Sequence, residues 1–121
     1  MTEQDLEHIE TSLGVKLPDE YRRTMTSDDC QRNGEFWYGG LFNQPGRIIE
    51  DTQRLRDITS SFDAPCPLTW VVVGEINGGD PTFVDTAEAG SPLRYWNHET
   101  MQVENCTTTV TAFVKSALDL I

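Results

Sequence analysis

One stretch, "TWVVVGEINGGDPTFVDT" at residues 69–86, constrains the fold of this chain most strongly. Its first half is a β-branched and aromatic run, which favours a central strand covered on both faces. Asn77, Gly78 and Gly79 then supply the positive φ values that a tight hairpin connection requires. Because "PTFVD" resumes a strand pattern after the glycines, the stretch predicts two antiparallel strands joined by a short turn.

The same Gly-Gly-Asp turn raises the alternative of a phosphate-binding loop. Such a loop needs a strand, a glycine-rich turn and then a helix whose free amides point at the anion, usually with a basic residue nearby. Here a strand follows the turn, the nearest base further along the chain is Arg94, and an anion would meet Glu75, Asp80 and Asp85. The hairpin interpretation is therefore favoured over a phosphate site.

Helical patterns dominate the first half of the chain. Thr2 predicts a helix cap, and the apolar residues that follow at helical spacing end at Gly14. "KLPDEYRRTM" begins a second helix, with Pro18 in its first turn. We expect an irregular strand at 36–42 after an Asn33-Gly34 turn, a short strand at 47–49, and a third helix that ends near Phe62.

The second half predicts a three-stranded meander and a closing helix. Strands are expected at 69–76, 82–85 and 93–96, with the loop "TAEAGSP" between the last two. The threonines before Val110 predict the cap of an amphipathic C-terminal helix. These elements predict an α+β fold, with an antiparallel sheet and helices at both ends packed mainly to one side of it. A chain of 121 residues predicts one domain, 1–121.

Charge and composition exclude several classes of function. The chain has 20 acidic and 9 basic residues, a net charge of -11, which argues against direct nucleic-acid binding. Cys30, Cys66 and Cys106 form no CxxC pair, so we expect neither a metal nor a cofactor. No apolar run is long enough for a membrane span, and "MTEQDLEHIE" lacks the basic start of a signal peptide, so we expect a cytoplasmic protein.

The acidic excess has two interpretations. Composition alone favours simple solubility. The sharper hypothesis is a surface that attracts a basic protein partner. Its candidate residues are Asp28, Asp29, Glu35, Glu75, Asp80, Asp85, Glu88, Glu99 and Glu104.

Two further groups of side chains are candidates for a site. Carboxylates at 75, 80 and 85 raise a weaker hypothesis of a small hydrolase, which Asp80→Asn would inactivate, but no nucleophile adjoins them in sequence. We therefore expect no enzyme. Trp70 and one of Tyr95 and Trp96 are expected in the core, because neighbouring strand residues face opposite ways. The other is expected in a partner-facing patch, with His98 as a hydrogen-bonding residue at the strand end.

Four motifs in order resemble the SUKH superfamily, which includes the yeast Smi and Knr cell-wall regulators. They are "LGVKLPDEYRR" followed by an Asn-Gly loop, "VVVGEINGGDPTFVDT", "LRYWNHET" and the terminal amphipathic helix. The chain departs from the family pattern at "RNGEF", which lacks a second adjacent glycine, and at Pro81.

The resemblance implies an α+β fold and a non-catalytic role. For most bacterial members it implies an immunity protein that binds and neutralises a cognate toxin, often a nuclease. For eukaryotic members it implies a regulatory scaffold in cell-wall synthesis and signalling. The short chain is similar to the bacterial branch, so we expect an immunity protein, with the scaffold as the alternative.

Overall fold

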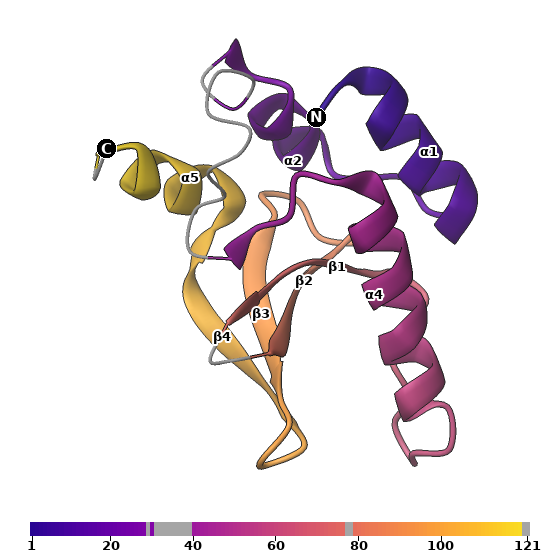
Figure 1. Ribbon diagram of the computed structural model, residues 1–121. Coiled ribbons are helices and arrows are strands. Elements are labelled where there is room, and N and C mark those ends of the chain that lie inside the picture. Colours follow the sequence, from indigo (N-terminus) through magenta and orange to yellow (C-terminus); the bar gives the residue numbers. More distant parts are fainter. Residues whose placement is uncertain (29, 31–39, 77–78, 120–121) are drawn as a thin grey trace.

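The computed structural model describes residues 1–28, 30, 40–76 and 79–119 of the chain (Figure 1). The elements are α1 (Glu3–Leu13), α2 (Asp19–Met25), α4 (Pro45–Thr59), β1 (Trp70–Ile76), β2 (Asp80–Asp85), β3 (Pro92–Asn97), β4 (Gln102–Thr109) and α5 (Val110–Asp119). The strands form an antiparallel meander in the order β1-β2-β3-β4, and Leu41 adds a single bridge to Gly74 in β1.

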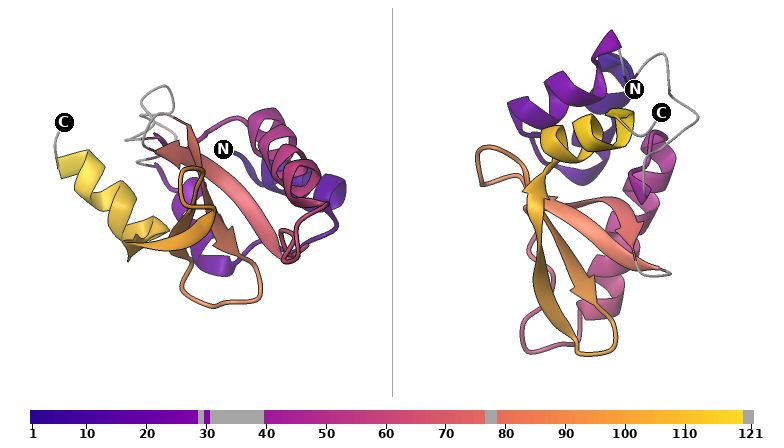
Figure 2. Two further views of the ribbon diagram at one scale, coloured as in Figure 1. Left: turned by 90° about the horizontal axis from the view of Figure 1, so that it is seen from below. Right: turned by 90° about the vertical axis from the view of Figure 1, so that its left-hand side faces the viewer.

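Helices surround this sheet on one face and at one end. Figures 1 and 2 show α4 running along the sheet, while α1, α2 and α5 gather around the end at which β4 leads into α5. This arrangement confirms the predicted α+β class. The core lies between these helices and the sheet, and its largest fully buried side chains include Leu6, Tyr21, Ile48 and Phe83.

The Gly-Gly-Asp motif turns a hairpin, as predicted. Ile76 at the end of β1 pairs with Asp80 at the start of β2. The N–H of Gly79 donates to the carbonyl of Ile76 at 3.1 Å, and Gly79 has a φ of 134°, which favours glycine. Asn77 and Gly78 lie outside the described residues.

The predicted helix ends at the N-terminus are confirmed. Thr2 and Asp5 form a reciprocal capping box, and Gly14 ends α1 with a φ of 69°. Arg22 of α2 reaches both Glu3 and Glu10 of α1 at 2.5 Å, which joins the two helices. Pro18 is the residue before the first turn of α2 rather than a member of it.

One predicted strand is wrong, and one observed strand was not predicted. Residues 47–49 are not a strand, because α4 begins at Pro45 and buries Ile48 on its inner face. Thr109 caps α5 as predicted, since its hydroxyl accepts the N–H of Ala112 at 3.2 Å. It also ends a fourth strand of the meander, β4, which was not predicted. Its polar composition lacks the apolar alternation by which strands are recognised. Most of the strand predicted at 36–42 lies outside the described residues.

Contacts from two other segments cover the outer edge of β1. The Thr52 hydroxyl of α4 accepts the N–H of Val72 at 2.9 Å, and the N–H of Phe42 donates to the carbonyl of Val73 at 2.8 Å. One face of α4 also carries Thr59, whose hydroxyl accepts the N–H of Cys66 at 2.9 Å. The edge of the sheet and the loop after α4 thus both depend on hydroxyl groups of this helix.

Gly40 and Gly74 meet so closely that neither has room for a side chain. A Cβ on Gly74 would lie 2.3 Å from the carbonyl oxygen of Gly40, so Gly74→Ala must move backbone. We expect this substitution to lower the free energy of unfolding by about 2–3 kcal/mol, measured by urea denaturation. Gly46→Ala is the control: nothing lies within 4 Å of a Cβ there, and a helical alanine gains up to about 1 kcal/mol. Equal effects of the two substitutions would contradict the close approach.

Candidate functional site

The candidate acidic residues divide between the two ends of the sheet. At the end nearer α5, both carboxylate oxygens of Glu88 accept hydrogen bonds from Arg94, at 2.7 and 2.9 Å. Asp85 accepts the N–H of Ala87 at 2.9 Å and so shapes the loop after β2. These two acids already have structural partners.

At the opposite end, acids from three strands and a turn lie around the tip of the β3–β4 hairpin. Glu104 accepts the phenol of Tyr95 at 2.5 Å and the amide of Asn97 at 3.0 Å. These bonds stabilise the carboxylate, lowering the pKa of Glu104 and raising the pKa of Tyr95. The neighbouring Glu99 is exposed on the turn itself.

A contact between Asp80, at the start of β2, and His98, in the turn after β3, joins the β1–β2 hairpin to the β3–β4 hairpin. Asp80 is only 3% exposed, and it accepts hydrogen bonds from the backbone N–H of His98, at 3.2 Å, and from Nδ1 of the imidazole ring. The hydrogen bond from His98 lowers the pKa of Asp80, and the same contact raises the pKa of His98. His98 is thus the strand-end hydrogen-bonding residue that the sequence predicted.

The remaining candidate acids lie apart from this tip or beside it. Glu75 is 3.4 Å from Arg47, whose guanidinium also lies over the ring of Phe42 at 4.3 Å. Asp28 is exposed beyond the end of α2. Asp29 and Glu35 lie outside the described residues. The structure therefore brings Glu75, Asp80, Glu99 and Glu104 to one end of the sheet and leaves Asp28, Asp85 and Glu88 elsewhere.

The carboxylates of the hydrolase hypothesis do not converge. Asp80 and Asp85 stand five positions apart on β2, which in an extended strand is roughly 17 Å. Their partners also differ, since Asp80 is bound by His98 and Asp85 by a backbone amide. In residues 1–28, 30, 40–76 and 79–119, no group of three His, Cys, Asp or Glu side chains is placed to hold a metal ion.

The aromatic residues separate onto the two faces of the sheet. Trp70 stacks on Phe83 at 4.0 Å between ring centroids and belongs to the α4 side. On β3, Trp96 shares that side and packs against the core, with Phe62 at 6.3 Å. Tyr95 faces the opposite side. Tyr95 and Trp96 thus lie on opposite faces, as predicted, and Trp96 is the member that packs against the core. The partner-facing position expected for the other member stays a prediction.

Trp96 forms the ridge between two hollows of about 220 and 240 Å³. Both hollows lie between α4 with its following loop and the sheet, and both are lined by Leu55 and Trp96. We call this surface the Trp96 groove. The residues that also line it include Ile58, Pro81, Met101 and Val103.

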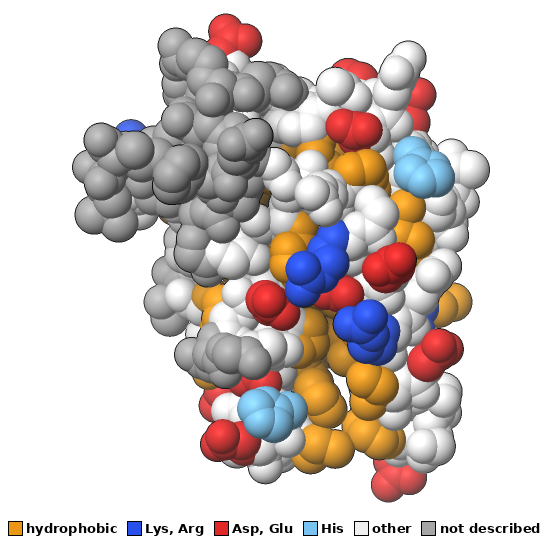
Figure 3. All heavy atoms as spheres, viewed as in Figure 1, with side chains coloured by type: hydrophobic (Ala, Val, Ile, Leu, Met, Phe, Trp, Pro, Cys, Tyr) orange, Lys and Arg blue, Asp and Glu red, His pale blue; other side chains and the backbone are white. Residues whose placement is uncertain are grey.

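Large apolar side chains are exposed along the Trp96 groove. Ile58 is 50% exposed, Met101 54% and Val103 42%. Figure 3 shows hydrophobic side chains gathered between the sheet and α4, with acidic, basic and histidine side chains around them. The sequence does not mark these residues as exposed. Ile58 fits the apolar stripe of a buried helix face, and the polar stretch around Met101 and Val103 predicted no strand. Met101 and Val103 are nevertheless the only aliphatic residues in "NHETMQVENC", which is a signal of an exposed apolar strip.

None of the helices in the described part of the chain has both the length and the apolar character needed to cross a bilayer.

The Asp80–His98 pair predicts a pH dependence with a definite sign. Because the pKa of His98 is raised, its protonated form stabilises the fold below the ordinary imidazole pKa of about 6.5, and this is lost as pH rises through the raised value. Glu99 contributes to the same shift. We expect stability to fall as pH rises above about 6.5, and His98→Gln to abolish that fall, as measured by urea denaturation over a series of pH values.

His8→Gln is the matched control, because His8 is exposed on α1 and far along the chain from Asp80. It should leave the pH profile unchanged. An unaltered profile in His98→Gln would contradict the role of the pair. The lowered pKa of Asp80 acts separately: its contribution is present above the ordinary carboxyl pKa of about 3.9 and is lost as pH falls through the lowered value.

Among known proteins, one family model matches the chain, while curated proteins and solved structures give no match. The model of the SMI1 / KNR4 family (SUKH-1) matches residues 1–116. No curated protein and no solved structure gives a significant match. The match spans α1, α2, α4, all four strands and the first part of α5. The chain therefore belongs to the SMI1 / KNR4 family (SUKH-1), as its motifs predicted.

Proposed function

We propose that this protein is an immunity protein that binds and neutralises a cognate toxin domain, with the Trp96 groove at the centre of the interface. The family to which it belongs includes immunity proteins. The proposed mechanism is occlusion: the protein covers the active surface of the toxin, and no reaction takes place on the chain itself. We further propose that it acts in the cytoplasm, where an intracellular toxin would have its target.

The observation that carries the proposal is the exposed apolar strip around Trp96. Contiguous exposed apolar patches on soluble proteins mark interaction sites, especially where polar residues surround them. Tryptophan and methionine are enriched at protein interfaces, and tryptophan is among the residues that contribute most to binding. Trp96 is supported from below by the core and from the side by Phe62, so it is already ordered before a partner arrives.

Charge supports a basic partner. Glu75 and Glu99 lie at the rim of the groove or beside it, and the net charge of the chain is -11. We propose that Glu75 and Glu99 face the toxin at close range. Asp80 is buried and bound by His98, and Glu104 is held by Tyr95 on the other face, so these two act only through a longer-range field. Asp28, Asp29, Glu35, Asp85 and Glu88 add to the same field, which speeds encounter. If the toxin is a nuclease, Glu75 and Glu99 occupy the place of substrate phosphates.

The arginines of α4 give the groove a mixed border. Arg47 and Arg54 both pair with Asp51, at 3.1 and 3.2 Å, beside the acidic tip. A purely cationic surface would meet repulsion there. The proposed toxin therefore presents an apolar centre to Trp96, basic side chains to the hairpin tip and a few acidic or polar groups to α4.

The decisive experiment has two stages. Affinity capture from the native organism's lysate, followed by mass spectrometry, supplies a candidate toxin, which is then produced with and without this protein. Protection of growth on co-expression, together with a stoichiometric complex and loss of toxin activity in vitro, would establish immunity. A captured set that contains only signalling or cell-wall enzymes, with no protection, would favour the regulatory scaffold instead.

Substitutions in the groove separate docking from general surface effects. We expect Ile58→Asp to weaken the toxin complex by at least about 2 kcal/mol, or roughly 30-fold in Kd, because it places a charge in the apolar centre. Leu68→Asp is the matched control: Leu68 is 70% exposed but does not line either hollow, so the affinity should stay within about 2-fold. Isothermal titration calorimetry gives both values. Equal losses would place the interface elsewhere.

Charge reversal tests the acidic tip. Glu99→Lys should slow association with the toxin more than Glu7→Lys does, although both change the net charge equally and both sites are exposed. Stopped-flow measurements at rising salt should show the association rate falling and the two variants converging, since screening shortens the reach of the field. Association that is fast and indifferent to salt would refute the electrostatic part of the proposal.

A further inference from the structure

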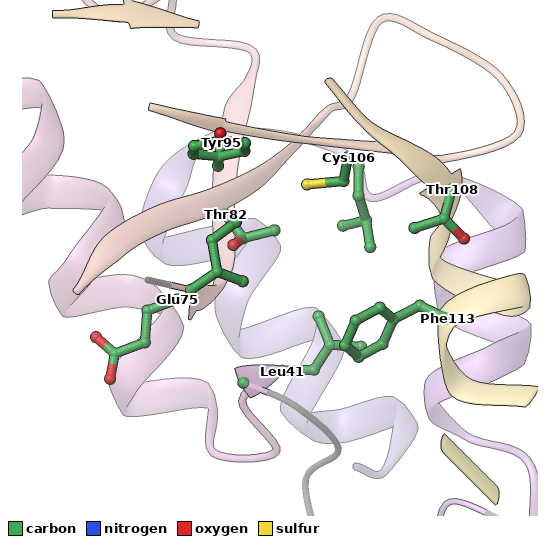
Figure 4. A pocket seen from close by; sticks show the side chains of 10 residues that line it. Leu41, Glu75, Thr82, Tyr95, Cys106, Thr108 and Phe113 are labelled. Atoms are coloured by element: carbon green, nitrogen blue, oxygen red, sulfur yellow. The ribbon is translucent and has the colours of Figure 1, made fainter. Parts of the chain in front are cut away.

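A cavity of about 260 Å³ lies on the face of the sheet opposite the Trp96 groove. It is partly open to solvent and is bounded by the four strands on one side, by α5 on another, and by Leu41 where the chain bridges to β1. Figure 4 shows the side chains of Leu41, Thr82, Cys106 and Phe113 around one shared space, with Tyr95 beside it. Apart from Glu75 at the rim, none of its lining residues lines the hollows of the groove.

Thr82 gives this cavity an unsatisfied polar group. The residue is only 4% exposed, and its Oγ1 is covered, with under 1 Å² accessible and no hydrogen-bond partner among the described residues. A turn about χ1, which exchanges the positions of the hydroxyl and the methyl group, brings it to a ligand in the cavity. A buried hydroxyl without a partner costs free energy, so such groups in folded proteins are nearly always bonded to protein or to ordered water. Because a hydroxyl both donates and accepts, a ligand with either kind of polar group satisfies it.

The remaining walls favour a flat apolar ligand. Phe113 and Tyr95 offer two aromatic rings, and Cys106 offers a polarisable sulfur, all of which interact favourably with another ring. Leu93 adds aliphatic surface. The Tyr95 phenol is held by Glu104 at 2.5 Å, which fixes the ring and leaves Thr82 as the free polar group.

The size of the space agrees with this chemistry. An apolar cavity of about 150 Å³ admits benzene, so 260 Å³ has room for a bicyclic ring. We propose that the cavity is a binding site for a small aromatic molecule with one hydrogen-bonding group, which is oriented by Thr82. This site lies on the other face of the sheet from the Trp96 groove and shares only Glu75, at its rim, with it.

Indole and indene form the test pair, because they have nearly the same shape and only indole carries an N–H donor. Binding of indole to the full chain should reach saturation. The accompanying chemical-shift changes in heteronuclear NMR spectra should centre on Thr82, Tyr95, Cys106 and Phe113. Indene should bind about 3- to 10-fold more weakly, the usual worth of one hydrogen bond. Failure of indole to saturate, or changes centred on Trp96, would overturn the proposal.

Two variants make the assignment specific. Thr82→Val keeps the shape and removes the unsatisfied hydroxyl, so it should raise the Tm of the free protein and abolish the preference for indole over indene. Cys106→Phe should fill the cavity and remove binding of both ligands while the far-UV circular dichroism stays native. If Cys106→Phe does not fold, Thr82→Val still decides: an unchanged preference for indole would refute the role of the hydroxyl.

Discussion

The attachment of α4 to the edge of β1 is the contact on which the rest of the structure depends. The Thr52 hydroxyl binds the N–H of Val72, and beside it the backbones of Gly40 and Gly74 approach within a distance that no side chain allows. These contacts fix the distance between α4 and the sheet. The Trp96 groove lies between α4, which packs on β1, and the side chains of β3 and β4, and Leu55 of α4 and Trp96 of β3 line both of its hollows.

The alternation of residues along β3 explains why one thin sheet carries two candidate sites. Trp96 points toward α4 and Tyr95 toward α5, so consecutive residues belong to different surfaces. The acids at the hairpin tip lie where these surfaces meet. Asp80 and His98 hold that tip together, since they join the start of β2 to the turn after β3. A change in either residue therefore affects the border of both surfaces at once.

The sequence predicted those features that depend on local chemistry. The Thr2 cap, the Gly14 stop and the glycine hairpin each follow from a few neighbouring residues, and each is observed. The Trp96 groove could not be predicted in this way, because Ile58 and Met101 come together only when a helix and a distant turn pack on the same strand. The acidic residues show the same limit: Asp80 and Glu88 are close in sequence, but β2 carries them to opposite ends of the sheet.

Strand β4 was missed because it is polar, and the same property has a consequence for the whole molecule. It is the last strand of the meander, and no strand among the described residues pairs with its outer backbone groups. An apolar strand in that position would be a template on which further chains could add. The charge of Glu104 on this strand opposes such an association, because a second copy added at the edge would bring like charges together. The polar composition that makes β4 hard to recognise in the sequence thus also disfavours the addition of further copies of the protein at this edge in concentrated solution.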